Sequence, residues 1–220
     1  MSTLIVKEFI NYKDFTLGMD QPPKDGNPVD YLKQRVYYNY NSKGFRDDEW
    51  PNDLSDAVWC IGDSFTSGVA QPQNETWPAK LKLEHGVKII NLGEDGCSND
   101  TICLRALEVF EKYKPKNIVI MWSYLHRRRE NGKNVHHSKE SFGLEKDLEN
   151  FHKNYNAANN LPTNVINLIV PTSESKHLKL EKILDYQILD YARDDYHFGT
   201  KTCSNIANQL QMHILTKSSK

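Results

Sequence analysis

The sequence predicts an α/β fold in which helices cover both faces of a mainly parallel sheet. From residue 57 onward, short apolar runs rich in Val, Ile and aromatic residues recur along the chain, as in fully buried parallel strands. Stretches with helical patterns lie between these runs. Because strands that alternate with helices are typical of βαβ units, both observations favour the same architecture. A length of 220 residues suits one such domain.

The predicted sheet has five strands. Four runs of five or six residues are strong strand candidates, and a fifth run is weaker. Their length suits strands better than helices. The strong runs span residues 57–61, 87–92, 117–122 and 165–170, and the weaker run spans residues 186–191.

Five helices are predicted between and after these strands. Thr76 can cap a helix over residues 76–84, which has a proline in its first turn, where proline is tolerated. Ser98 or Asn99 can cap a longer helix that runs to Lys114 and carries a broad apolar stripe. The remaining helices are expected over residues 139–155, 176–184 and 200–214.

Residues 1–55 differ from the rest of the chain because they are polar and rich in turns. They include Pro22-Pro23 and Asp25-Gly26, dipeptides that mark loops. We therefore expect an N-terminal extension over residues 1–55, packed on a core domain of residues 56–220, rather than a second domain.

The composition excludes several classes of partner. Lys and Arg number 28 against 29 Asp and Glu, so the formal net charge of −1 gives no electrostatic basis for binding nucleic acid or an anionic membrane. No apolar run approaches the ~20 residues that span a bilayer, and the first residues do not resemble a secretory signal. The four cysteines are scattered without C-x-x-C spacing, so no metal site is expected. The expected location is the cytoplasm.

The carboxyl ends of parallel strands are where ligands bind in such a sheet. After the first predicted strand, Gly62 permits a tight turn, so that Ser64 of the tripeptide Gly62-Asp63-Ser64 projects from the sheet edge. By itself the tripeptide is more typical of a serine that caps the following helix. It also differs from the Gly-x-Ser-x-Gly elbow of α/β-hydrolases, because Thr66 stands where the second glycine belongs.

Two later strand ends carry residues of complementary chemistry. After the second strand, Gly93 and Gly96 let the backbone approach a ligand closely, and the N–H groups of the following helix suit an anion or a developing oxyanion. After the last strand, Asp194 or Asp195 lies near His197, and a carboxylate there can orient an imidazole as a catalytic triad requires. Taken singly, these segments are also typical of an ordinary turn and of a charged surface loop.

Together, the three segments resemble the blocks of the SGNH hydrolases, also called GDSL esterases and lipases, over residues 57–210. The resemblance implies that Ser64 is the nucleophile and that Asp194 and His197 complete a Ser-His-Asp triad. It also implies that the N–H groups of Ser64 and Gly96 receive the oxyanion. The fold that it implies is a three-layer α/β/α, flavodoxin-like one. The implied activity is hydrolysis of acyl esters, often on carbohydrates or lipids, without a metal or an organic cofactor.

The third block of this family is altered here. The family usually carries Gly-x-Asn-Asp after the third strand, and the Asn side chain donates to the oxyanion. The corresponding segment, residues 121–129, reads Met-Trp-Ser-Tyr-Leu-His-Arg-Arg-Arg and contains no Asn. Since losing one oxyanion donor typically lowers the rate by about 10²–10³, we expect either a substitute, with Asn99 and Ser123 as the nearest candidates, or a weak activity.

Two features resemble a bacterial and phage subgroup of the family. The segment Asn41-x-x-Gly-Phe-Arg46 is similar to the one that precedes the nucleophile strand in many bacterial and phage members. The altered block, Trp122-Ser-x-x-x-Arg127, is similar to a variant in marine and phage sequences. The run of arginines at residues 127–129 either holds an anionic substrate or forms a solvated charged surface.

These observations predict a serine esterase that acts on an acyl ester of a small molecule or a glycan. Two alternatives use the same fold. The same residues could transfer the acyl group to a sugar hydroxyl, as in a carbohydrate O-acyltransferase. Alternatively, the altered third block marks a non-catalytic glycan-binding module, which would be virion-associated if the chain is phage-encoded.

Overall fold

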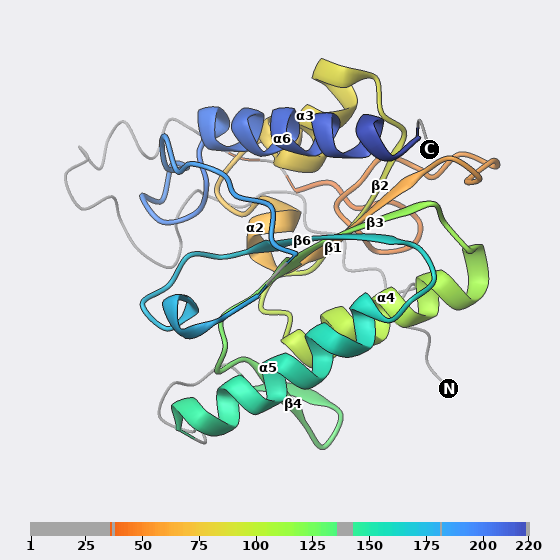
Figure 1. The fold of residues 1–220 in the computed structure, drawn as a ribbon. Coiled ribbons are helices and arrows are strands. Elements are labelled where there is room, and N and C mark those ends of the chain that lie inside the picture. Colours follow the sequence, from red (N-terminus) through yellow and green to blue (C-terminus); the bar gives the residue numbers. More distant parts are fainter. Residues whose placement is uncertain (1–35, 37, 136–142, 181, 219–220) are drawn as a thin grey trace.

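A parallel sheet forms the centre of the molecule. The computed structural model describes residues 36, 38–135, 143–180 and 182–218 (Figure 1). Within these residues the main sheet has four strands, which pair in parallel in the order β2, β1, β3 and β6. Their bounds are Ile89–Gly93 for β2, Val58–Gly62 for β1, Asn117–Trp122 for β3 and Asn164–Ile169 for β6.

Helices cover both faces of this sheet, as Figure 1 shows. On one face α3 packs against α6, and on the other α4 packs against α5. The bounds of these helices are Trp77–His85, Thr200–Ser218, Asn99–Tyr113 and Leu144–Asn159, respectively. The three-layer α/β/α class predicted from the sequence is therefore confirmed.

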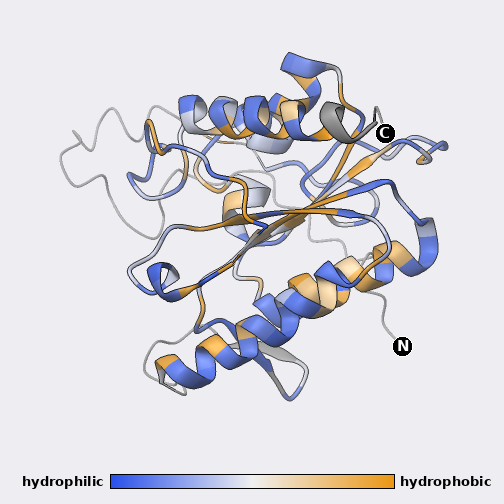
Figure 2. Ribbon diagram, viewed as in Figure 1, coloured by the Kyte–Doolittle hydropathy of each residue, from blue (hydrophilic) through white to orange (hydrophobic). Residues whose placement is uncertain are grey.

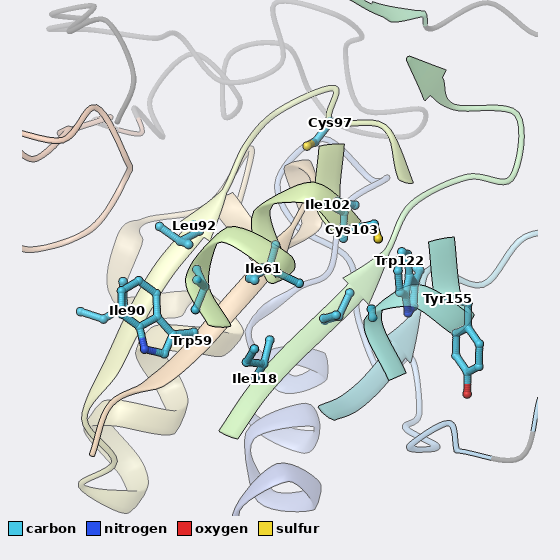
Figure 3. Close-up of a cluster of buried hydrophobic side chains, with 14 of the residues drawn as sticks. Trp59, Ile61, Ile90, Leu92, Cys97, Ile102, Cys103, Ile118, Trp122 and Tyr155 are labelled. Atoms are coloured by element: carbon cyan, nitrogen blue, oxygen red, sulfur yellow. The ribbon is translucent and has the colours of Figure 1, made fainter. Parts of the chain in front are cut away.

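The alternation of side chains along the strands divides the apolar interior into two cores. In β1, Trp59 and Ile61 enter the core beneath α4 and α5, where Figure 3 shows Trp59 beside Ile90 of β2. Val58 and Cys60 of the same strand enter the opposite core, beneath α3 and α6. Because helices cover both faces of the sheet, every residue of β1 is buried. Figure 2 shows the strands of the sheet as mainly hydrophobic.

The helix boundaries follow from the caps that the sequence offers. The Thr76 hydroxyl accepts the N–H of Ala79 at the start of α3. At the start of α4, Ser98 is the cap and accepts the N–H of Thr101, which decides between the two predicted candidates. Each bond satisfies an N–H group that has no partner within its own helix.

Two predicted elements are wrong. The predicted helix over residues 176–184 does not form in the described residues 176–180 and 182–184, where η3 is a single 3₁₀ turn at Ser175–His177 and the chain has no further helical turn. It passes along the edge of β6, where Ile183 forms an isolated parallel bridge with Asn167. The Asn167 backbone carbonyl accepts the N–H of Leu184, and its side chain donates to the Lys182 carbonyl. These bonds favour an extended path over a helix.

The predicted fifth strand at residues 186–191 is also absent. Side chains of α6 bind the backbone there and take the place of a neighbouring strand. The Thr202 hydroxyl accepts the N–H groups of Leu189 and Asp190, and Asn205 accepts that of Gln187. The predicted helix over residues 139–155 begins at Leu144 in the structure, and residues 139–142 lie outside the described residues.

Short elements complete the described chain. The strands β4 (Arg128–Glu130) and β5 (Lys133–Val135) form an antiparallel hairpin after β3. Its turn residues Asn131 and Gly132 both have positive φ, as a tight hairpin turn favours. The one-turn helix α2 (Ser64–Ser67) follows β1, and η1 (Gln73–Glu75) precedes α3. No helix in the described part of the chain has the length and apolarity needed to cross a membrane.

Part of the N-terminal segment is described, and it packs on the core domain. Phe45 is fully buried in the core beneath α4, and Tyr38 packs in a small cluster with Ala70 and Ala192. Residues 1–35 lie outside the described residues, so the division between extension and core domain stays a prediction.

Candidate active site

The first predicted site segment forms a strand–turn–helix. At the end of β1, the Asp63 carboxylate accepts the N–H of Phe65 and caps α2. Ser64 is the first residue of this helix and is buried. Gly68 ends the helix with a φ of 78°, and its N–H donates to the Ser64 carbonyl. A methyl group at Gly93 of β2 would collide with the backbone of Ser67, so that glycine is needed for the close approach of β2 to the turn.

A buried arginine from the N-terminal segment fixes the far side of the same turn. The Arg46 guanidinium donates to the carbonyls of Ser67 at 3.1 Å, Gln71 at 2.7 Å and Gly68. It also lies 4.2 Å from the ring centroid of Tyr38. These carbonyls follow a helix end and have no intrahelical partner, so Arg46 supplies the donors that they lack. The sequence indicated the segment but not this contact.

The last predicted segment brings a carboxylate to the imidazole. Asp194 Oδ2 lies 2.6 Å from His197 Nδ1, while Asp194 Oδ1 accepts the N–H groups of Tyr196 and His197. Burial alone would raise the pKa of Asp194, but the hydrogen bonds from His197 and the two backbone groups bring it below its ordinary value. Asp195 is exposed and has a φ of 55°. The contact with His197 thus favours Asp194 as the orienting carboxylate.

The loop that carries His197, here called the histidine loop, meets the turn at Ser64–Ser67 through aromatic rings. The ring of Phe65, the residue after Ser64, lies 4.6 Å from the His197 ring and 4.6 Å from that of Phe198. Tyr196 packs edge-on against His197 and is 52% exposed. The structure therefore places His197 beside the turn that carries Ser64, with an exposed aromatic ring next to both.

Two backbone N–H groups at this position lack partners. Within the described part of the chain, neither Ser64 N nor Gly96 N donates a hydrogen bond to protein. The loop of Gly96 is tied to the first strand end, because Glu94 N donates to the Gly62 carbonyl at 3.0 Å. Arg105 anchors the same loop through the Leu92 carbonyl and the Glu94 carboxylate. Ser64 is buried and Gly96 is half-buried, and a bound oxyanion would satisfy both N–H groups.

The expectation that Asn99 supplies an oxyanion donor does not fit its contacts. The Asn99 side-chain amide donates to the carbonyls of Tyr124 at 3.0 Å and Ser123 at 3.4 Å, and its oxygen accepts the N–H of Ser123. All these bonds hold the loop that follows β3. Because both amide hydrogens are engaged, Asn99 positions this loop and does not point a free donor at a substrate.

The second expected substitute is engaged as well. The Ser123 hydroxyl donates to Asp63 Oδ2 at 2.5 Å. Arg127 Nη1 donates to the same carboxylate oxygen at 3.0 Å and to Ser123 Oγ at 3.1 Å. Burial raises the pKa of the Asp63 carboxyl, and the Arg127 guanidinium is the largest opposing influence. The sequence marked Arg127 as part of the altered third block and of a charge run, but it did not predict this contact with the turn that carries Ser64.

Metal-ligating side chains do not gather in this region. Among the described residues, no three His, Cys, Asp or Glu side chains cluster in a way that could hold a metal ion. The four cysteines are buried and form no disulfide among the described residues.

Comparison with known proteins bears on the fold. No protein-family model and no curated protein sequence matches the chain. The esterase EstA from Pseudoalteromonas sp., inhibited by monoethylphosphonate, matches with a TM-score of 0.51 at 14% identity, covering 76% of this chain and 100% of that one. A family two carbohydrate esterase from Clostridium thermocellum, in complex with cellohexaose, matches with a TM-score of 0.51 at 15% identity, covering 77% of this chain and 66% of that one.

A third solved structure comes from the G-D-S-L family of lipolytic proteins. This protein of Desulfitobacterium hafniense matches with a TM-score of 0.50 at 16% identity, covering 72% of this chain and 99% of that one. The chain described here therefore has the fold of the GDSL hydrolases.

Proposed function

We propose that this protein is a serine hydrolase that cleaves a carboxylic acyl ester through an acyl-enzyme. The observation that carries the proposal is the pair of Asp194 and His197, held against the turn that presents Ser64. The N–H groups of Ser64 and Gly96, which have no partner among the described residues, add to it. The esterases that share the fold support this reaction class.

The proposed reaction has two steps. Ser64 Oγ attacks the carbonyl carbon while His197 Nε2 takes the hydroxyl proton, and the carbonyl electron pair moves onto oxygen. The N–H groups of Ser64 and Gly96 receive this oxyanion. When the tetrahedral intermediate collapses, the alcohol leaves with the proton from His197. Water then attacks the acyl-enzyme with His197 as base, which releases the acid and restores Ser64.

Asp194 has a supporting role in this scheme. Its carboxylate fixes the imidazole through Nδ1, so that Nε2 is the nitrogen available to Ser64, and it stabilises the imidazolium that forms. The low pKa of Asp194 keeps this carboxylate ionised at neutral pH.

The proposed substrate is an acyl ester of a small molecule or a glycan. Exposed aromatic rings lie on the histidine loop, where Tyr191 is 56% exposed and Tyr196 is 52% exposed. An exposed ring beside the reacting carbon suits the apolar face of a sugar or a short acyl chain. The carbohydrate esterase among the proteins of this fold supports the same class.

The test is hydrolysis of p-nitrophenyl acetate, followed by release of p-nitrophenolate. We expect turnover by the wild-type protein and a loss of about 10³ or more in Ser64→Ala, because the nucleophile is gone. Ser67→Ala, in the same turn, is the matched control and should keep activity within tenfold. Wild-type protein that shows no turnover, yet binds a glycan, would instead indicate the non-catalytic module.

A further inference from the structure

We propose that Arg127 takes the place of the missing third-block asparagine and donates to the oxyanion through its guanidinium. This inference rests on the proposed esterase function. It assigns to the reaction a residue that the family pattern does not predict.

Arg127 contacts both the turn of Ser64 and the start of α4. Its side chain reaches the carboxylate of Asp63, the residue immediately before Ser64, at 3.0 Å. Its backbone carbonyl accepts the N–H of Asn99 at 3.3 Å, at the start of α4 and just beyond the loop of Gly96. Arg127 therefore spans the two segments whose N–H groups are proposed to receive the oxyanion.

The Arg127 guanidinium is held through one of its nitrogens, Nη1. Nη1 alone accounts for the bonds to Asp63 and Ser123, while Nη2 and Nε have no protein partner in the described part of the chain. The side chain is 17% exposed. The Tyr124 ring lies 4.8 Å from the guanidinium carbon and restrains its plane. One edge of the fork is thus anchored, and the other edge keeps free N–H donors.

Asn99 and Ser123, the two other candidates for the oxyanion donor, are engaged elsewhere. The amide of Asn99 donates to two backbone carbonyls, and the hydroxyl of Ser123 donates to Asp63. Neither group retains a hydrogen for an oxyanion. Among the described polar side chains after β3 that contact the turn of Ser64, Arg127 is the one with unengaged donors.

The chemical consequence concerns the charge of the transition state. As Ser64 Oγ bonds to the carbonyl carbon, the carbonyl electron pair becomes a full negative charge on oxygen. A guanidinium N–H donates a charge-assisted hydrogen bond to this oxygen, which is stronger than the bond from a neutral amide. In the protein without substrate, the Asp63 carboxylate pairs with the Arg127 guanidinium. This ion pair holds the guanidinium in place before the oxyanion forms.

The test compares Arg127→Gln and Arg127→Lys with the wild type on p-nitrophenyl acetate. Glutamine removes the charge and leaves the buried Asp63 carboxylate unpaired, which can weaken the fold. Lysine keeps the ion pair with Asp63 but has no second nitrogen for the oxyanion. We expect kcat to fall by about 10²–10³ in both variants while KM changes less than threefold, since only the transition state loses a bond.

Two further measurements separate this role from a structural one. Phenylboronic acid, which forms a tetrahedral anionic adduct with an active serine, should lose inhibitory affinity by about the same factor as kcat in Arg127→Lys. Arg129→Gln, which removes a positive charge from the same run, should keep kcat within threefold. Thermal unfolding of each variant shows whether a loss of kcat reflects a loss of fold.

The outcomes distinguish this inference from the function beneath it. If the wild type turns over and Arg127→Lys keeps kcat within threefold, or raises KM alone, Arg127 is no oxyanion donor and the esterase proposal stands. If the wild type has no turnover and no reactive Ser64, both proposals fall. A parallel loss of kcat and boronate affinity in folded Arg127→Lys supports the assignment.

Discussion

The turn around Ser64 and the histidine loop are built in different ways. The turn around Ser64 lies between two strand ends, and Arg46 binds its carbonyls from the other side. The loop that carries His197 has almost no regular secondary structure and depends on side chains such as Thr202 and Asp194. This difference indicates that the position of Ser64 is set by the fold, whereas the position of His197 depends on a few local hydrogen bonds.

Substitution of Asp194 tests whether the position of His197 depends on local hydrogen bonds, and we expect the largest loss of activity from it. Asp194→Asn should lower kcat on p-nitrophenyl acetate by about 10⁴, because the imidazole loses its orienting carboxylate. Asp195→Asn, one residue along the same loop, should keep activity within tenfold. Steady-state kinetics of both variants decide the matter. The reverse ranking would move the orienting role to Asp195, and two mild effects would mean that His197 works without a carboxylate.

The next expected effect tests the side that belongs to the fold. Arg46→Met should lower the free energy of unfolding by about 3 kcal/mol, since buried carbonyls at the end of α2 lose their donors. Activity should fall with stability, because the turn that presents Ser64 loosens. Urea unfolding monitored by Trp fluorescence measures the change. Lys43→Met, at an exposed position of the same segment, is the control and should change stability by no more than about 0.5 kcal/mol.

A stable Arg46→Met protein with reduced activity would alter the comparison. It would mean that Arg46 acts on the geometry of Ser64 without contributing to the fold. The position of the turn around Ser64 would then depend on local contacts, as the position of the histidine loop does.

The smallest expected effect concerns Asp47, next to Arg46. Burial raises the pKa of Asp47 to about 7, although its carboxylate accepts the N–H of Asn91 on the edge strand β2. The folded state therefore binds the proton more tightly than the unfolded state. The stability that this contributes is complete below about pH 4 and is lost as pH rises through 7.

Asp47→Asn should remove this pH dependence. Between pH 4 and pH 7 the wild type should lose about 1 kcal/mol of unfolding free energy relative to the variant, since the carboxyl is half-buried and water screens part of the penalty. Urea unfolding at several pH values provides the two curves. Parallel curves would show that Asp47 does not titrate in this window.

The four paired strands of the main sheet, the helices that cover them and the segments of the candidate site could be predicted from the sequence. Buried parallel strands are recognisable because both of their faces are apolar, and the cap at Ser98 is a local feature. The turn at Gly62 and Ser64 and the spacing of Asp194 and His197 are also local, so their chemistry could be proposed before the fold was known.

The remaining features depend on contacts between distant residues. Residues 186–191 have a strand-like composition, yet Thr202 and Asn205 of α6 bind their backbone and exclude a strand. The sequence predicts Asn99 as a candidate oxyanion donor, but its side-chain amide donates to the carbonyls of Ser123 and Tyr124. No local pattern marks either contact.

The most direct test of the central claim is labelling with a fluorophosphonate, which reacts with a serine only when a neighbouring base activates it. The account predicts a single adduct on Ser64, found by mass spectrometry of the digested protein, and loss of p-nitrophenyl acetate turnover in proportion to labelling. Ser64→Ala should carry no adduct. An unlabelled wild-type protein, or an adduct on another residue, would contradict the assignment of Ser64 as the nucleophile.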